Sequence, residues 1–343
     1  MNKKFDFKDI TLVPEVISTI SSRKEINPYN ENGSLPIMVS PMDTVVDEDN
    51  HEMFIKNKLE VCLPRGVFSN KYEGFNSISL SDFEDLVKWY PDGVVEGEKV
   101  KFLIDIANGH MEKLHDLCRE FVSLRTSSNH EIMVGNIANP KTFEKFCEIG
   151  VDYVRVGIGG GSGCLTSANT GVHYPIASLI SECYNIKKIN GYKTKIIADG
   201  GFRNYDDIIK ALALGADYVM LGGILNKTLE SCSTTMLFNI IPLNDLYSKY
   251  VWEVFPSMRK YMYKNFRGMS TKEVQKKWGK EKLTTSEGIS KVNKVEYTLE
   301  SWVENFEDYL RSAMSYTNSK TLEDFKNTET VFITQNALNR YHK

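Results

Sequence analysis

The sequence predicts an α/β protein whose strands close into a (β/α)8 barrel, also called a TIM barrel, and three observations point to this fold class. Seven short apolar runs recur along the chain, and they are apolar on both faces, as buried parallel strands are. Nearly all end in glycine or polar residues, where such barrels place their chemistry. Amphipathic segments separate the later runs, as the helices of βα units do. An open doubly wound sheet is the alternative, but seven such strands favour the closed barrel.

The apolar runs supply seven of the eight strands that a barrel needs. In chain order they are LPIMVSPMD (35–43), LEVCLPRG (59–66), KFLIDIANG (101–109), EIMVGNI (131–137), DYVRVGIGG (152–160), KIIADGG (195–201) and DYVMLGG (217–223). The third strand is expected within residues 67–100, where DGVVEG (92–97) is the only weak candidate. A barrel of this kind takes residues 1–343 as a single domain.

The helical segments between the later strands carry their own boundary signals. In NYDDIIKALALGA (204–216), Asn204 suits the N-cap, Asp207 falls in the first turn and Gly215 closes the end. These signals predict a helix between the seventh and the eighth strand.

Composition and charge exclude several classes of function. The net charge is -3 with acidic and basic residues interspersed, so nothing indicates a nucleic-acid partner. No apolar run approaches the ~18 residues that a membrane helix needs. The N-terminal MNKKFDFKDI lacks the apolar core of a signal peptide, and the six cysteines show no metal-ligand spacing. We therefore expect a cytoplasmic protein with reduced thiols that binds small, discrete ligands.

A glycine-rich loop, GIGGGSGC (157–164), follows the sixth strand. Its glycines let backbone N–H groups approach a ligand closely, and the strand end holds Cys164 over the barrel mouth. A lone cysteine is usually packing material. This setting instead favours a nucleophile, whose thiolate needs backbone amides or a nearby charge to stabilise it.

Two further glycine turns predict a phosphate site. ADGG (198–201) ends the seventh strand and LGG (221–223) ends the eighth, which is where barrels commonly bind phosphate. Backbone amides there can bind a phosphate without Lys or Arg. Asp199 suits sugar hydroxyls because an ionised carboxylate only accepts hydrogen bonds. Together these turns predict a phosphorylated sugar compound whose reactive part reaches toward Cys164.

Longer motifs resemble those of the IMP dehydrogenase and GMP reductase family, purine nucleotide oxidoreductases on a (β/α)8 barrel. The segments that carry the resemblance are FDFKDITLVP, SPMDTV, DIANGH, VGIGGGSGCLT, IIADGGFRNYDDIIKALALGADYVMLGG, FRGMS, SEG and LRSAMSYTNSKTLEDF. They run through most of the chain, and their combination is highly specific. The resemblance implies a mobile active-site flap at about residues 264–290.

The resemblance also implies roles for individual residues. Cys164 would attack C2 of the purine of a nucleoside monophosphate and form a covalent thioimidate, and Thr166 with Glu287 would be a proton-relay pair. The residues implied for substrate binding are Ser162, Gly201, Gly222 and Gly223 for the phosphate, Asp199 for the ribose, and Met269 and Ser270 with the adjoining Gly268 for the base.

A cofactor, a cation and an assembly follow from the same resemblance. NADPH would supply a hydride and face Asp105, Asn108 and Gly109. Backbone carbonyls of Gly159, Gly161 and Cys164 would bind a monovalent cation, K⁺. The chain would form a homotetramer.

The reductase branch of the family is favoured over the dehydrogenase branch. Residues 66–105 leave no room for the regulatory domain pair that the dehydrogenases usually carry there. The flap segment GMSTKEVQKKWGKEKLTTSEG lacks the Arg–Tyr pair with which they activate water. The predicted function is therefore that of a GMP reductase, which converts GMP to IMP and ammonia with NADPH. Two alternatives stay open, namely an IMP dehydrogenase without regulatory domains and a purine-nucleotide-binding protein without turnover.

Several departures from the family pattern bear on the ligands. SPMDTV resembles the dehydrogenases, Ser167 stands where the family's C-T-T-R motif has Arg, and Thr284 replaces the reductase Arg two places before SEG. Residues 63–100 lack the family's His-Lys and Ser-rich cofactor motifs. A modified purine nucleotide is therefore also compatible with the sequence.

Overall fold

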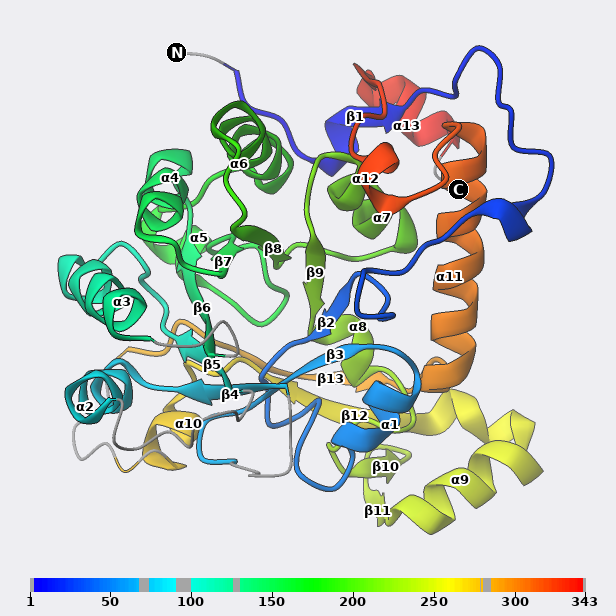
Figure 1. Cartoon of the computed structure of the whole chain (residues 1–343). Helices are drawn as coiled ribbons and strands as arrows, with labels where there is room; N and C mark the ends of the chain where they lie inside the picture. The colour runs from blue at the N-terminus through cyan, green and yellow to red at the C-terminus, as the bar shows by residue number, and fades with distance from the viewer. Residues whose placement is uncertain are drawn as a thin grey trace.

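Eight parallel strands form a closed barrel in chain order in the computed structural model, which describes residues 3–67, 74–90, 100–125, 130–277, 279 and 285–341 (Figure 1). The strands are β2(Ile37–Val39), β3(Glu60–Leu63), β4(Phe75–Ile78), β5(Val100–Asp105), β6(His130–Ile137), β7(Tyr153–Val156), β8(Lys195–Asp199) and β9(Tyr218–Leu221). The first strand closes on the last, with Met38 opposite Met220. The predicted (β/α)8 barrel is confirmed.

The third barrel strand lies within residues 67–100, as predicted, but not at the weak candidate DGVVEG. It is β4, which pairs with β3 on one side and with β5 on the other. DGVVEG (92–97) lies outside the described residues. The prediction missed β4 because its sequence, FNSI, is not an apolar run. Asn76 and Ser77 are polar but buried in this strand.

The core has two parts, one inside the barrel and one between the strands and the surrounding helices. The barrel interior is filled by a cluster of nine buried side chains, namely Met38, Cys62, Phe75, Leu103, Met133, Tyr153, Ile197, Tyr218 and Met220. Outside the strands, the helices are α1(His51–Lys56), α2(Leu80–Trp89), α3(Glu112–Leu124), α4(Pro140–Ile149), α5(Thr166–Thr170), α6(Ile176–Asn190), α7(Tyr205–Ala213), α8(Gly223–Asn226) and α11(Leu299–Tyr316). The filled interior leaves the carboxyl ends of the strands as the place for a ligand.

The boundary signals of α7 work as predicted. Asn204 is its N-cap, and the Asp207 carboxylate accepts from the Asn204 N–H at 3.3 Å. At the other end, the Gly215 N–H donates to the Leu212 carbonyl at 3.1 Å.

A second sheet lies beside the carboxyl ends of the barrel strands and carries the predicted flap. It is antiparallel, in the order β11(Ile241–Leu243), β10(Thr235–Leu237), β12(Met262–Arg267) and β13(Ser290–Lys294). The flap region, 264–290, starts in β12 and ends in β13, which pair from Tyr263 and Lys294 to Arg267 and Ser290. It contains α10(Lys272–Lys277), whereas α9(Asp245–Val254) and the 3-10 helix η3(Pro256–Tyr261) precede it. The mobility of the flap stays a prediction.

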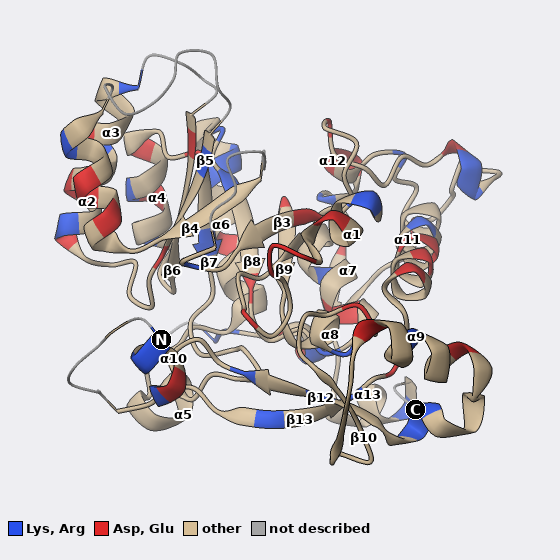
Figure 2. Ribbon diagram, turned by 90° about the horizontal axis from the view of Figure 1, so that it is seen from below, with Lys and Arg blue, Asp and Glu red and all other residues tan. Residues whose placement is uncertain are grey.

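A two-stranded sheet joins segments from near the two ends of the chain. The strand β1(Ile10–Leu12) pairs antiparallel with β14(Thr330–Phe332). The remaining elements are η1(Phe7–Asp9), η2(Arg23–Glu25), α12(Leu322–Phe325) and α13(Gln335–Tyr341). Acidic and basic side chains are mixed over the ribbon (Figure 2). All six cysteines are free thiols, and no helix in the described part of the chain has the length and apolarity to cross a membrane.

Candidate active site

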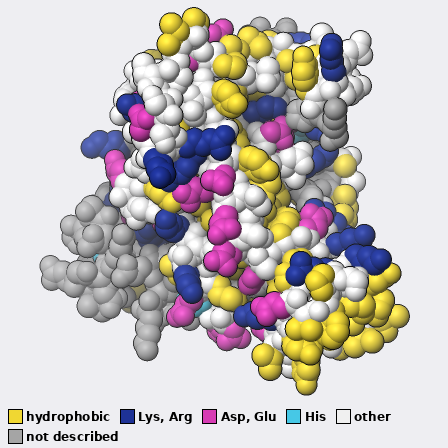
Figure 3. Space-filling model, turned by 90° about the vertical axis from the view of Figure 1, so that its right-hand side faces the viewer, with side chains coloured by type: hydrophobic (Ala, Val, Ile, Leu, Met, Phe, Trp, Pro, Cys, Tyr) yellow, Lys and Arg dark blue, Asp and Glu magenta, His cyan; other side chains and the backbone are white. Residues whose placement is uncertain are grey.

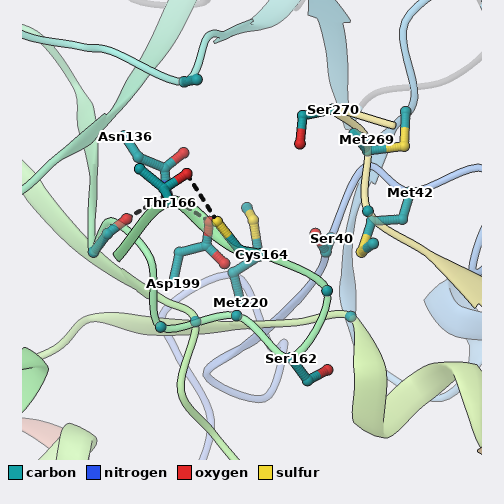
Figure 4. A pocket seen from close by; sticks show the side chains of 18 of the residues that line it. Ser40, Met42, Asn136, Ser162, Cys164, Thr166, Asp199, Met220, Met269 and Ser270 are labelled. Carbon is teal, nitrogen blue, oxygen red and sulfur yellow. Dashed lines mark hydrogen bonds between the residues drawn. The ribbon is translucent and has the colours of Figure 1, made fainter. Parts of the chain in front are cut away.

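A cavity of about 500 Å³ opens at the carboxyl ends of the barrel strands, between the glycine loop and the flap. It gathers most of the residues that the sequence singled out, from six different segments of the chain, and Figure 4 shows several of them together. Those that line it are Asp105, Gly159, Gly161, Ser162, Cys164, Thr166, Asp199, Gly201, Gly222, Gly223, Gly268, Met269, Ser270 and Glu287. Met269 and Ser270 lie across the cavity from Asp199.

A chain of hydrogen bonds joins the thiol to a carboxylate. The Cys164 thiol donates to Thr166 Oγ1 at 3.2 Å, and the Thr166 hydroxyl donates to the carboxylate of Glu287 in a short hydrogen bond. A proton can therefore pass from sulfur to carboxylate through one hydroxyl. This arrangement has the form of a nucleophile with an adjacent base.

Backbone hydrogen bonds hold Glu287 near the thiol. This contact is long-range, because 121 positions of the chain separate Glu287 from Thr166. The Leu165 N–H donates to the Glu287 carbonyl at 2.6 Å, and the Ile289 N–H donates to the Gly163 carbonyl at 3.0 Å. Cys164 and Gly288 form an isolated antiparallel bridge between these contacts. The end of the flap is thus paired with the glycine loop as a short strand would be.

The glycine turns approach one another too closely for side chains. A Cβ on Gly223 would lie 2.7 Å from Ser162 Oγ. A Cβ on Gly200, whose φ is +90°, would lie 2.9 Å from the Gly161 backbone nitrogen. The loops after β7, β8 and β9 therefore form one wall made of backbone. Concave walls of this kind bind anions through their N–H groups.

Asp199 ends β8 beside this wall and has one free acceptor atom. Its Oδ2 accepts from Asn136 Nδ2 at 2.7 Å and from the Arg155 guanidinium at 2.9 Å. In the described part of the chain, no residue donates to its Oδ1. Because Oδ2 is already hydrogen-bonded and Oδ1 is not, Oδ1 can accept a hydrogen bond from a sugar hydroxyl.

Arg155 is a central charged residue of the site that the sequence analysis missed. Its side chain is 7% exposed and bridges Asp105 at 2.8 Å and Asp199 at 2.9 Å. Burial alone lowers the pKa of Arg155, but the two carboxylates outweigh it and raise the pKa above its ordinary value. Arg65 also pairs with Asp105, at 3.6 Å. The available signal was a charged residue in the middle of an otherwise apolar strand, YVRV, and a polar residue, Asn136, near the end of EIMVGNI.

The flap is tied to the barrel by a second charged group. Asp43, which follows β2, accepts from the Arg267 guanidinium at 2.6 Å and from the Lys277 ammonium at 3.1 Å. Burial raises the pKa of Asp43, but the hydrogen bonds from Arg267 and Lys277 outweigh this and lower it overall. Arg267 directly precedes Gly268, so the ion pair fixes the start of the segment that faces the cavity.

Comparison with known proteins agrees with this arrangement. Residues 94–343 match the model of the IMP dehydrogenase / GMP reductase domain. The chain belongs to this family. GMP reductase 2 of Mus musculus is 32% identical over 66% of this chain and 70% of its own length. GMP reductase 1 of Homo sapiens is 34% identical over the same shares. GMP reductase of Onchocerca volvulus is 28% identical over 98% of this chain and 93% of its own length.

The cofactor residues implied by the IMP dehydrogenase and GMP reductase family are only partly brought together. Asp105 lines the cavity, but among the described residues Asn108 and Gly109 do not. Asn108 is exposed and accepts from the His110 N–H at 3.1 Å. Gly109 is buried and donates to the Asn136 carbonyl at 2.8 Å. Their assignment to the nicotinamide stays a prediction.

The predicted cation site lies in the glycine loop, where two of its carbonyls already accept hydrogen bonds. The Ser167 hydroxyl donates to the Gly159 carbonyl at 2.9 Å, and the Cys164 N–H donates to the Gly161 carbonyl at 2.9 Å. Each carbonyl keeps a second lone pair, so a cation remains compatible with the loop. Ser167, which replaces the family Arg, thus braces the loop.

The flap side of the cavity has a polar residue that the sequence analysis also missed. Gln275 of α10 lines the cavity, is buried, and donates to the Ser270 carbonyl at 3.2 Å. In the segment KEVQKK, Gln275 is one of several polar residues, and the sequence does not distinguish it from the others. Its direction toward the cavity is set by the fold. Thr284, the other departure from the family pattern, lies outside the described residues.

Proposed function

We propose that the chain is a GMP reductase, which converts GMP to IMP and ammonia with NADPH. The observation that carries the proposal is the hydrogen-bonded chain from Cys164 through Thr166 to Glu287, at the mouth of a barrel of this family. A reductase must protonate a departing amino group, and this chain supplies a proton path to the carbon that the thiol attacks. The names of the relatives support the same activity.

The nucleotide would bind across the cavity. Backbone N–H groups of the glycine wall and the Ser162 hydroxyl hold the phosphate, and Oδ1 of Asp199 accepts from the ribose. The base then reaches Met269 and Ser270 on the flap side, with its C2 atom toward Cys164. Binding at the phosphate and the sugar places the base for the reaction, because remote contacts restrict its orientation.

In the first step the sulfur of Cys164 forms a bond to C2 and the C2–N bond of the amino group breaks. The thiol proton passes through Thr166 to Glu287 and then to the leaving nitrogen, so ammonia departs and a covalent thioimidate remains. In the second step C2 gains a hydride and the C–S bond breaks, which gives IMP and returns the thiolate. The covalent bond divides a difficult substitution at an aromatic carbon into two easier steps.

NADPH, when bound, supplies the hydride. The nicotinamide would bind in the part of the cavity that is lined by Asp105, Ile106 and Ala107. There the buried Nε of Arg155 has no hydrogen-bond partner among the described residues, which leaves a donor for a polar ligand. Arg155 would hold Asp105 on the cofactor side and Asp199 on the ribose side in one fixed arrangement.

The proton path is tested by Glu287→Gln, which keeps the shape of the side chain and removes its acid. We expect ammonia release from GMP to slow by ~10² or more, the usual scale for losing a general acid. Rapid-quench measurement of ammonia in a single turnover separates this step from hydride transfer.

Thr166 provides the matched pair of variants. Thr166→Ser keeps the hydroxyl and should retain most of the activity, whereas Thr166→Val has a similar shape without it and should behave like Glu287→Gln. Equal rates for Thr166→Ser and Thr166→Val would rule out the relay.

A further inference from the structure

An exposed apolar surface lies on the segment that precedes the flap, away from the cavity. Six large side chains of the hairpin end and α9 are 50% to 76% exposed, namely Ile240, Ile241, Leu246, Tyr247, Tyr250 and Val254. We call them the α9 face. Hydrophobic side chains gather at the lower end of the molecule in Figure 3, the end at which Figure 1 places α9 and β11.

Helix α9 is apolar on both of its sides. Val251 and Trp252 pack inward against the small cluster of Leu229, Met262 and Val295. The outward side carries Leu246, Tyr247, Tyr250 and Val254, at the spacing i, i+1, i+4 and i+8, which forms a stripe on a helix. The inward side is covered by this chain, whereas the outward stripe is left exposed.

The area of the α9 face matches what a stable contact needs. With about 200 Å² for a tyrosine and about 100 Å² for an aliphatic side chain, the exposed fractions correspond to roughly 500 Å² of apolar surface. The largest apolar patch on an ordinary monomer is about 300 to 600 Å². A standard interface buries about 800 Å² on each partner, of which about 65% is apolar in homodimers. The α9 face alone therefore supplies the apolar part of such an interface.

The arrangement of the face is self-complementary. Leu246 and Val254 lie four residues before and after Tyr250, so a two-fold axis at Tyr250 sets Leu246 of one copy against Val254 of the other. Lys249 and Glu253 are exposed along the same flank of the stripe, and neither has an ion pair in the described part of the chain. In an antiparallel pair each would meet the opposite charge of the second copy.

We propose that the α9 face binds the α9 face of a second copy of this chain, with the two α9 helices antiparallel about a two-fold axis near Tyr250. The contact lies outside the cavity, so it does not depend on the proposed reaction. It supplies one isologous interface of the assembly and leaves any other interface unchanged.

The double variant Leu246→Glu/Tyr250→Glu tests the proposal on the full chain. Sedimentation equilibrium should give an even number of chains for the wild type and half that mass for the variant, with the same far-ultraviolet circular dichroism spectrum for both. The control is Ile189→Glu/Tyr316→Glu, which changes two side chains that are 82% and 66% exposed outside the face. It should keep the wild-type mass. A monomeric wild type, or one mass for all three proteins, would overturn the proposal.

The charged pair tests the antiparallel arrangement. Lys249→Glu and Glu253→Lys should each weaken self-association about tenfold, because each sets like charges against one another. The combined variant Lys249→Glu/Glu253→Lys should restore it, since the charges are exchanged in both copies. Association that is equally weak in the combined variant would contradict an antiparallel pair and favour a different protein as the occupant.

Discussion

Cys164 differs from the other five cysteines in its surroundings. Burial raises the pKa of Cys147 to about 11 and that of Cys232 to about 12. Three more thiols, Cys62, Cys118 and Cys183, are fully buried, and desolvation raises their pKa values further. Cys164 alone lines the cavity and has a hydroxyl to receive its proton. The fold thus provides one thiol with both access to a ligand and a route for its proton.

The Cys164→Ala variant should lose turnover and keep its affinity for the nucleotide within about tenfold, because the phosphate wall and Asp199 bind independently of the thiol. Titration calorimetry with GMP measures the affinity, and loss of NADPH absorbance measures the turnover. Cys232→Ala, which removes a thiol outside the cavity, should leave both unchanged. Substantial turnover by Cys164→Ala would remove the nucleophile assignment.

The flap is the element on which the site depends, and it is attached at both ends. Its last residues are paired with the glycine loop through the Leu165 and Ile289 N–H groups. Its first residues are held by Asp43, whose side chain is 10% exposed. Because the pKa of Asp43 is lowered, this attachment is complete above the ordinary pKa of an aspartate and is lost only as the pH falls through the lowered value. The ion pair that holds the start of the flap is therefore present at neutral pH.

Removing the charge in Asp43→Asn should raise the KM for the nucleotide about tenfold and change kcat less than threefold, because the ion pair positions the flap and takes no part in the chemistry. Hydrogen exchange gives a readout that is independent of activity. Amides of β12 and α10 should exchange faster, whereas those of the barrel strands should not change.

Glu273→Gln is the matched control for Asp43→Asn. Glu273 also pairs with Arg267, at 3.1 Å, but its side chain is 69% exposed, and exposed pairs contribute little. It should leave KM unchanged. An unchanged KM in Asp43→Asn as well would show that the flap does not need this attachment.

At the scale of the whole molecule, periodicity alone predicted seven of the eight barrel strands. Buried parallel strands are recognisable as apolar runs in the sequence. The glycine turns after β7, β8 and β9 predict where a phosphate would bind. β4 was missed because Asn76 and Ser77 are buried polar residues. Arg155 and Gln275 were missed because their inward direction is set by tertiary packing. The α9 face was missed because exposure is a property of the folded chain and not of the sequence pattern.

The proposed GMP reductase activity joins the thiol, its relay and the flap in a single reaction, and one assay tests it most directly. The full chain is incubated with GMP and NADPH while ammonia and NADPH absorbance are followed together. The proposal predicts one ammonia released for each NADPH oxidised, with IMP as the product. Formation of XMP and NADH from IMP and NAD, with no ammonia from GMP, would contradict the reductase assignment and would leave the barrel and the family in place.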